Sequence, residues 1–245
     1  MKIIKDVFGF IWAIWAAIVF LVTITVLTIA YFLIISIGGK KYVMKCVWFN
    51  YHYVSTFLLF FYLIRVRVHG KKKIDPKKTY VIVANHSAQM DIVAGVYACP
   101  LPAKFLAKSE IKYIPFFGYM TKMLAIMVNR GNKESREKSF RLMVEALRKG
   151  ESLFIYPEGT RNRSEQLLKE FKDGAFRVAI MAQVPIAAHT VVGAKQLNDP
   201  NKIQLLPGII DIYWSDPIET TGMTLQDMPA LKERVKREML NYLER

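Results

Sequence analysis

The residues best suited to chemistry are His86 and Asp91, which lie in the stretch 85–91 directly after a β-rich run at 80–84. On a regular helix, positions five apart point about 140° away from each other, so the two side chains cannot share a helix face. They can meet if His86 lies in the turn after the strand and Asp91 on the helix that follows. The carboxylate would then hold the imidazole in one tautomer and leave the other nitrogen to accept a proton. The alternative is a surface histidine beside a helix N-cap formed by Ser87.

Two further motifs also follow β-rich runs. The first is Asn129-Arg130-Gly131, which follows the run at 126–128. An arginine beside a flexible glycine could bind a phosphate with two parallel hydrogen bonds. The second is Pro157-Glu158-Gly159-Thr160-Arg161, which follows the run at 152–156 and places two ionisable side chains on a tight loop. An ordinary turn is the alternative interpretation of each motif.

The position of these motifs is more informative than each motif alone. In open α/β sheets, ligands bind outside the carboxyl ends of the strands. If the strands are parallel neighbours, His86, Asp91, Glu158, Arg130 and Arg161 would meet in one cleft. A neutral histidine can act as general base for a hydroxyl group and contributes roughly 10²–10⁴-fold to the rate. The arginines would bind and orient a phosphate-bearing substrate, so the set suits acyl transfer to a hydroxyl of such a substrate.

The elements expected to position these residues alternate in type after residue 70. The pattern predicts a single α/β domain with a central mostly parallel or mixed sheet flanked by helices. The strands are expected at 80–84, 104–107, 126–128, 152–156, 185–192 and 209–214, and the helices at 92–98, 133–149, 175–183 and 228–243.

The N-terminal part is apolar and reads as a membrane segment. Residues 7–36 carry no charge, and this run is long enough to span a bilayer as a helix. Basic residues precede this run, interrupt it at Lys40 and Lys41, and follow a second, less uniform apolar stretch at 42–64. Two full spans would place the central basic turn on the far side, against the positive-inside tendency, so a two-helix hairpin dipping into one leaflet is favoured. A cleaved signal peptide fits less well because the run is too long.

This division predicts a membrane-anchoring segment at 1–66 and the α/β domain at 67–245. Lys and Arg number 35 against 20 Asp and Glu, a formal net charge of +15. Such a charge suits an anionic membrane surface or phosphate-bearing substrates. The apolar N-terminus favours the membrane, and no zinc-finger or RNA-binding pattern is found, so no nucleic acid partner is expected. Cys46 and Cys99 lack metal-ligand or disulfide spacing. We therefore expect no metal and no resident cofactor.

At these motifs the sequence resembles the glycerolipid acyltransferases, specifically the 1-acyl-sn-glycerol-3-phosphate acyltransferases, from about Tyr80 to Val192. The family's NHxxxxD motif matches 85–91, its second block ends in an arginine that matches Arg130, and its PEGTR block is intact at 157–161. A fourth block begins with Val-Pro-Ile, as at 184–186. Bacterial members carry an N-terminal two-helix membrane motif, which agrees with the one-leaflet interpretation.

The resemblance implies direct acyl transfer from acyl-CoA or acyl-carrier protein to the sn-2 hydroxyl of lysophosphatidate, giving phosphatidate. His86 would be the general base and Asp91 would orient it. Arg130 and the loop residues Glu158, Gly159, Thr160 and Arg161 would form the glycerol-phosphate site, with Lys104 as a further contact to an anionic group. The enzyme would lie on a membrane, at the cytoplasmic face of the cell membrane in a bacterium.

Two departures from the family pattern leave the acceptor open. Ala125 and Asn129 stand where the second block usually has Gly and Asp, and 187–189 reads Ala-Ala-His without the usual second proline. Another lysophospholipid, glycerol-3-phosphate or a lipid alcohol are therefore alternative acceptors. His189 is interpreted as a strand residue.

Two functional classes other than the acyltransferases agree less well with the sequence. A lipid hydrolase would typically need a G-x-S-x-G nucleophile elbow, which the sequence lacks. A non-catalytic lipid-binding protein would agree with the charge and the apolar segment but would leave the PEGTR block without a purpose.

Overall fold

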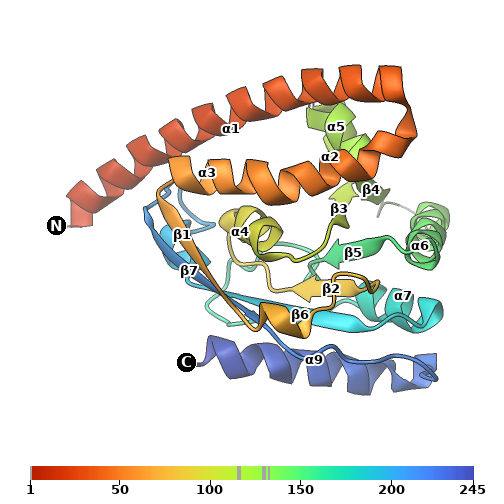
Figure 1. Cartoon of the computed structure of the whole chain (residues 1–245). Coiled ribbons are helices and arrows are strands. Elements are labelled where there is room, and N and C mark those ends of the chain that lie inside the picture. Colours follow the sequence, from red (N-terminus) through yellow and green to blue (C-terminus); the bar gives the residue numbers. More distant parts are fainter. Residues whose placement is uncertain (1, 115–116, 129–130, 132) are drawn as a thin grey trace.

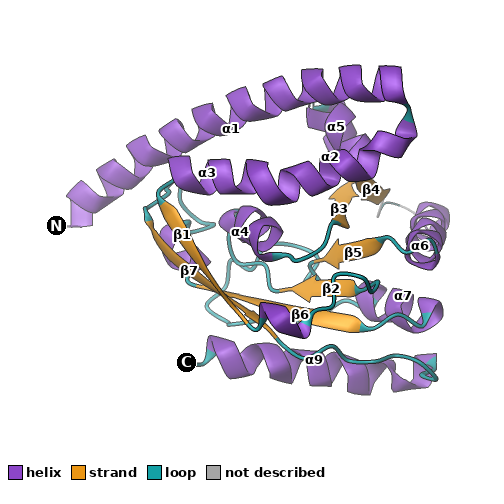
Figure 2. Cartoon of the chain, in the orientation of Figure 1, coloured by secondary structure: helices purple, strands orange, loops and turns teal. Residues whose placement is uncertain are grey.

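The structure is a computed structural model that describes residues 2–114, 117–128, 131 and 133–245. Within these residues, seven strands form one sheet in the order β1-β7-β6-β2-β5-β3-β4 (Figures 1 and 2). Neighbouring strands are parallel except for β6 and β7. The strands are β1 (Ile64–His69), β2 (Val81–Ala84), β3 (Ala103–Lys108), β4 (Ala125–Val128), β5 (Ser152–Ile155), β6 (Ile186–Val192) and β7 (Gly208–Trp214).

Side chains alternate between the two faces of this sheet, and both faces are buried. Val81, Val83 and Leu153 pack with the helices α6 (Lys133–Arg148), α7 (Gly174–Ala182) and α9 (Met228–Leu243) on one face. Ile82 and Phe154 point to the opposite face. This burial on both sides explains why the strands read as continuous apolar runs.

The opposite face is covered by α4 (Met90–Ala98) and, above it, by the N-terminal helices (Figure 1). Short elements complete the described chain: the 3₁₀ turns η1 (Lys40–Tyr42), η3 (Lys71–Lys73), η4 (Ser109–Tyr113) and η5 (Leu225–Asp227), and the helices α5 (Phe117–Leu124) and α8 (Ala194–Leu197).

The first apolar run forms one long helix, α1 (Lys2–Gly38), which is long and apolar enough to cross a membrane. The second stretch is divided into α2 (Val43–Phe49), the π-helical turn η2 (Asn50–Val54) and α3 (Ser55–Phe61). Backbone angles at the junctions stay in the right-handed helical region, so these pieces form one rod that runs back beneath α1 (Figure 1). Among the described helices, α1 alone meets the length and hydropathy expected of a span.

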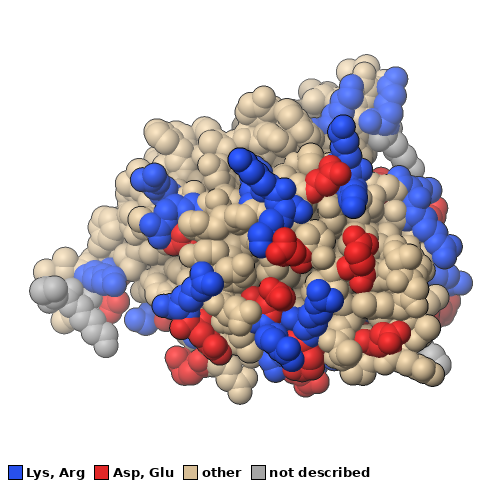
Figure 3. Space-filling model, turned by 60° about the horizontal axis from the view of Figure 1, so that its bottom comes forward, with Lys and Arg blue, Asp and Glu red and all other residues tan. Residues whose placement is uncertain are grey.

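α1 is fixed to the rest of the molecule near its N-terminal end. The indole N–H groups of Trp12 and Trp15 donate to the carbonyls of Tyr62 and Phe61, at 3.1 and 3.2 Å. These carbonyls lie at the end of α3, where helix carbonyls have no partner within the helix. The amide of Leu205 also donates to the Gly9 carbonyl at 3.0 Å. Figure 3 presents the side that carries α9, where acidic and basic side chains are interspersed.

The expected α/β class and mostly parallel sheet are confirmed. The strand β1 was not expected, although Ile64, Val66 and Val68 alternate with charged or polar residues in a period of two. This strand extends across the predicted boundary at residue 66, and that division stays a prediction.

Candidate active site

The site begins where the buried strand β2 ends. Asn85 follows this strand, and its side chain is only 2% exposed. Its amide group pairs with the backbone of Val191 in β6, accepting from the N–H at 2.7 Å and donating to the carbonyl at 2.9 Å. Asn85 thus fixes the start of the turn to the neighbouring strand. Asn85 is the first residue of the 85–91 motif, but the spacing of the motif does not reveal that its side chain binds β6.

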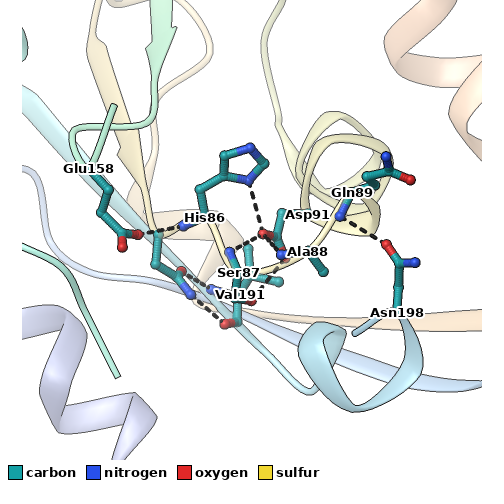
Figure 4. Close-up of polar contacts among 9 residues, drawn as sticks. His86, Ser87, Ala88, Gln89, Asp91, Glu158, Val191 and Asn198 are labelled. Carbon is teal, nitrogen blue, oxygen red and sulfur yellow. Dashed lines mark hydrogen bonds and ion pairs between the residues drawn. The ribbon is translucent and has the colours of Figure 1, made fainter. Parts of the chain in front are cut away.

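His86 and Asp91 meet as the turn-then-helix prediction requires. His86 lies in the turn, and Asp91 lies in the first turn of α4. The His86 Nδ1 atom is 3.1 Å from the Asp91 Oδ2 atom (Figure 4). If Nδ1 carries the proton and donates it to this carboxylate, Nε2 is left as the acceptor. The imidazole also stacks on the ring of Tyr156, with centroids 4.2 Å apart.

The Asp91 carboxylate is fully buried and is satisfied by backbone groups. Its Oδ2 atom accepts from the amides of Ser87 at 2.5 Å and Ala88 at 2.7 Å. A buried carboxylate needs such donors to remain charged. The alternative interpretation, a helix N-cap at Ser87, is not what the structure shows: Asp91 instead reaches back to bind the turn that precedes its own helix.

Glu158 holds His86 from the other side (Figure 4). Its side chain is 2% exposed, and its two carboxyl oxygens accept from the backbone amides of His86 at 2.7 Å and Lys169 at 3.0 Å. Burial raises the pKa of this carboxyl, while the two backbone hydrogen bonds act in the opposite direction. The sequence suggested a substrate contact for Glu158. In the structure, both carboxyl oxygens are instead occupied by backbone N–H groups, one from the turn after β2 and one from the loop after β5.

The loop after β5 reaches the catalytic turn. Gly159 has φ of +76°, a conformation that favours glycine and turns the chain sharply. Three residues later in the loop, the backbone amide of Asn162 donates to the His86 carbonyl at 2.6 Å. β2 and β5 are parallel neighbours, so the two motifs that follow them lie at the same edge of the sheet, as the strand-end argument predicts.

His86 and Arg161 line one elongated cavity of about 710 Å³. Gly159, Thr160 and Arg161 line this cavity together with His86 and residues of the N-terminal helices, and most of its wall is apolar. That wall includes Phe20 and Ile24 of α1, Val54 and Leu58 of the second rod, Val93 and Val96 of α4, and Phe105 of β3.

Two predicted residues remain, Arg130 and Lys104. Arg130 lies outside the described residues. Lys104 pairs with Glu151 at 2.7 Å and is not among the residues that line this cavity. Lys108, at the carboxyl end of the same strand, does line it. Lys104 stands near the amino end of β3, away from the catalytic turn, so its predicted contact with substrate gains no support.

His189 is fully buried in β6 and does not reach the cavity. Its ring packs edge-on against Phe154 and Trp214, with centroids 5.4 and 4.5 Å apart. Burial lowers the pKa of this imidazole to about 3, so it stays neutral. This agrees with the prediction of a strand residue. None of the described residues form a cluster of His, Cys, Asp and Glu that could hold a metal ion.

Comparisons with known proteins agree with the geometry. A family model described as Acyltransferase matches residues 65–192. The human 1-acyl-sn-glycerol-3-phosphate acyltransferase alpha is 30% identical over 74% of this chain and 64% of its own length. A putative 1-acyl-sn-glycerol-3-phosphate acyltransferase of Caenorhabditis elegans is 34% identical over 73% of this chain and 72% of its own. The match thus spans slightly less than two thirds of the human relative.

A solved structure has the same fold. It is the crystal structure of the 1-acyl-sn-glycerophosphate (LPA) acyltransferase from Thermotoga maritima, with a TM-score of 0.80 and 20% sequence identity. The match covers 100% of this chain and 97% of that one, so it includes the N-terminal helices.

Proposed function

This chain belongs to the acyltransferase family, and we propose that it transfers a fatty acyl group from an acyl thioester to the sn-2 hydroxyl of 1-acyl-glycerol-3-phosphate, giving phosphatidate. The observation that carries the proposal is His86, paired with Asp91, on the wall of a largely apolar cavity that Arg161 also lines. A base, a compartment for a hydrocarbon chain and a cation for a phosphate lie together there. The names of the relatives support the same acceptor and product.

In this mechanism the Nε2 atom of His86 takes the proton of the acceptor hydroxyl as its oxygen attacks the thioester carbonyl. The resulting imidazolium is stabilised by the buried Asp91 carboxylate. When the tetrahedral intermediate collapses, the C–S bond breaks and His86 returns the proton to the leaving thiolate. No acyl group is attached to the protein at any step.

The remaining residues bind or position. Arg161 binds the phosphate of the acceptor, because its planar guanidinium can donate two parallel hydrogen bonds to phosphate oxygens. Gly159, Thr160 and Lys108 also line the cavity. Glu158 is assigned a positioning role, because its two oxygens are already occupied by backbone N–H groups. Arg130 is retained as a second phosphate contact on the resemblance alone.

We also propose that the N-terminal helices anchor the enzyme in one leaflet, at the cytoplasmic face. At 1.5 Å per residue, a 37-residue helix is roughly 55 Å long, well beyond a hydrocarbon core of about 30 Å. Its exposed apolar side chains extend from Ile3 to Ile37, and Phe60 of α3 is 71% exposed. The hydrogen bond from Leu205 to Gly9 ties the beginning of α1 to the α/β domain. These features support a helix that lies along the membrane surface.

Labelling of a single cysteine tests the topology. Cys46 and Cys99 are buried, and Lys41→Cys places an exposed thiol at the turn between the helices. In the one-leaflet arrangement, a membrane-impermeant maleimide labels this thiol from the side of the α/β domain. Labelling from the opposite side would establish that the helices span the membrane.

The acyl-transfer proposal is tested with purified protein in detergent micelles, lysophosphatidate and a panel of acyl-CoA and acyl-carrier protein donors. The expected result is equal release of thiol and formation of phosphatidate. Transfer to lysophosphatidylethanolamine, glycerol-3-phosphate or a lipid alcohol in place of lysophosphatidate would change the assigned acceptor. Release of free fatty acid without acylated product would contradict transfer and indicate a hydrolase.

A further inference from the structure

A second hollow adjoins the cavity that contains His86. It measures about 490 Å³ and is lined by Thr160, Arg161, Arg163, Ser164 and Lys169. Three of these five side chains are cationic, two carry a hydroxyl group, and none of the five is acidic. Cations and hydroxyl donors are the groups that bind phosphate oxygens. The hollow therefore has the chemistry of an anion site.

The two spaces meet at a shared wall. Thr160 and Arg161 line both of them, whereas Arg163, Ser164 and Lys169 line the hollow and are not among the residues around the larger cavity. The hollow thus lies beyond Arg161 as seen from His86. Any phosphate bound against its outer residues must be connected to the reacting atoms by a long arm.

The two substrates differ in the length of that arm. In lysophosphatidate the phosphate is joined to the reacting sn-2 carbon by a single methylene group and an ester oxygen, so it stays near Arg161. In the donor, the whole pantetheine chain separates the thioester sulfur from its phosphate. This arm ends in a phosphate in both coenzyme A and acyl-carrier protein. The outer part of the hollow therefore suits the phosphate of the donor, which lies farther from the reacting atoms than that of lysophosphatidate.

The loop that forms the hollow is held in place from within. Asn162 is 3% exposed, and its Oδ1 atom accepts from the amide and the hydroxyl of Ser164 at 3.0 and 2.7 Å. The backbone amide of Asn162 donates to the His86 carbonyl. Because Asn162 is buried against the site, its neighbour Arg163 is left exposed at the surface. Such a pre-organised loop loses little conformational entropy when it binds a ligand.

Further contacts brace the rim. The Lys169 ammonium donates to the Thr160 hydroxyl at 2.9 Å, and the Lys195 ammonium donates to the Ser164 carbonyl at 2.7 Å. The side-chain amide of Asn201 donates to the Arg163 carbonyl at 3.2 Å. The cationic side chains of the hollow therefore belong to a loop that is held in place by hydrogen bonds.

We propose that this hollow binds the phosphate of the donor's 4′-phosphopantetheine arm, with Arg163 and Lys169 as its cations. The proposal rests on the proposed function, since it presumes a thioester donor. It separates the two phosphates of the reaction: that of the acceptor at Arg161, and that of the donor farther out.

The test compares donors with and without the phosphate. With acyl-CoA or acyl-phosphopantetheine as donor, Arg163→Ala should raise the KM about tenfold, the lower end of what a charge-assisted hydrogen bond contributes. With S-acyl pantetheine, which lacks the phosphate, the KM should not change. A matched loss of charge, Arg234→Ala on the exposed face of α9, should leave all these values at the wild-type level.

Three outcomes would overturn the assignment. An equal change with S-acyl pantetheine would mean that Arg163 does not bind the phosphate. A rise in the KM for lysophosphatidate with unchanged donor constants would assign the hollow to the acceptor. An effect with acyl-CoA that is absent with acyl-phosphopantetheine would assign it to the nucleotide part of coenzyme A. Acyl-carrier protein is expected to show the same loss as acyl-phosphopantetheine.

A binding measurement separates this proposal from the proposed function. An alkyl-phosphopantetheine thioether cannot be turned over, so its Kd can be measured by calorimetry even if no acceptor is found. The expected result is about tenfold weaker binding to Arg163→Ala than to the wild type. Equal Kd values would refute the hollow as a donor site whether or not the protein transfers acyl groups.

Discussion

Replacing Asp91 by asparagine tests the centre of the proposed mechanism. The Asp91 Oδ2 atom is 3.1 Å from the His86 Nδ1 atom, and the carboxylate is buried. At this separation, a charged imidazole and a carboxylate attract each other by about 5 kcal/mol in an effective dielectric constant of about 20. This attraction is absent in the ground state, where His86 is neutral, and present when His86 carries the hydroxyl proton. Asparagine removes it, so kcat should fall roughly 10³- to 10⁴-fold.

The same substitution should leave both KM values nearly unchanged, because Asp91 is not among the residues that line the cavity. The folded protein should be less stable by about 1.5–3 kcal/mol, since the Ser87 and Ala88 amides lose a charged acceptor. The assay is thiol release under single-turnover conditions, with thermal denaturation in parallel.

Asp211→Asn is the matched control. Asp211 also accepts from a histidine, since its Oδ1 atom is 2.8 Å from the His69 Nε2 atom, but this pair lies at the surface between β1 and β7. Its kcat should equal that of the wild type. A folded Asp91→Asn protein that keeps kcat within about tenfold of the wild type, or one that changes only KM, would refute the reasoning.

Three further predictions concern the surroundings of this pair. Glu158→Gln places an amide N–H₂ against a backbone N–H and should lower kcat about 10- to 100-fold without raising the KM for lysophosphatidate, as steady-state kinetics would reveal. Val96→Trp fills the apolar cavity and should shift the donor preference toward shorter acyl chains in a competition assay. For His189, the folded pKa of about 3 lies below the unfolded value of about 6.5, so the unfolded chain binds the proton first and stability falls as the pH drops below about 6.5. His189→Leu should reduce that slope by up to about 1.4 kcal/mol per pH unit, measured by urea unfolding between pH 4 and 7.

Local patterns in the sequence were sufficient to predict much of the sheet and the geometry of the catalytic pair. The continuous apolar runs at 80–84 and 152–156 marked β2 and β5 because strands buried on both faces need no polar alternation. The five-residue spacing between His86 and Asp91 excluded a shared helix face, and the turn-then-helix geometry followed from that.

Other features depend on partners that are distant in the sequence. The antiparallel pairing of β6 with β7 cannot be read from either strand alone. Glu158 resembled a binding residue because its backbone partners are not its neighbours in sequence: the amide of His86 lies on another loop, and that of Lys169 lies eleven residues farther along the same loop. Lys104 was chosen by charge, whereas its place near the amino end of β3 puts it far from the carboxyl ends at which ligands bind.

The pairing of β1 with β7 has a consequence for the order of events during synthesis. Ile64 lies beside Gly208, so 144 residues separate the two partners along the chain. At roughly 5–20 residues per second, the ribosome needs roughly 7 to 30 s to make that intervening length. During this interval α1 and the second helical rod have already been made. Two of their later partners do not yet exist: β7, which pairs with the strand that follows the rod, and the Leu205 amide, which donates to Gly9 of α1. A lipid surface that receives the apolar helices in this period would shield them from aggregation.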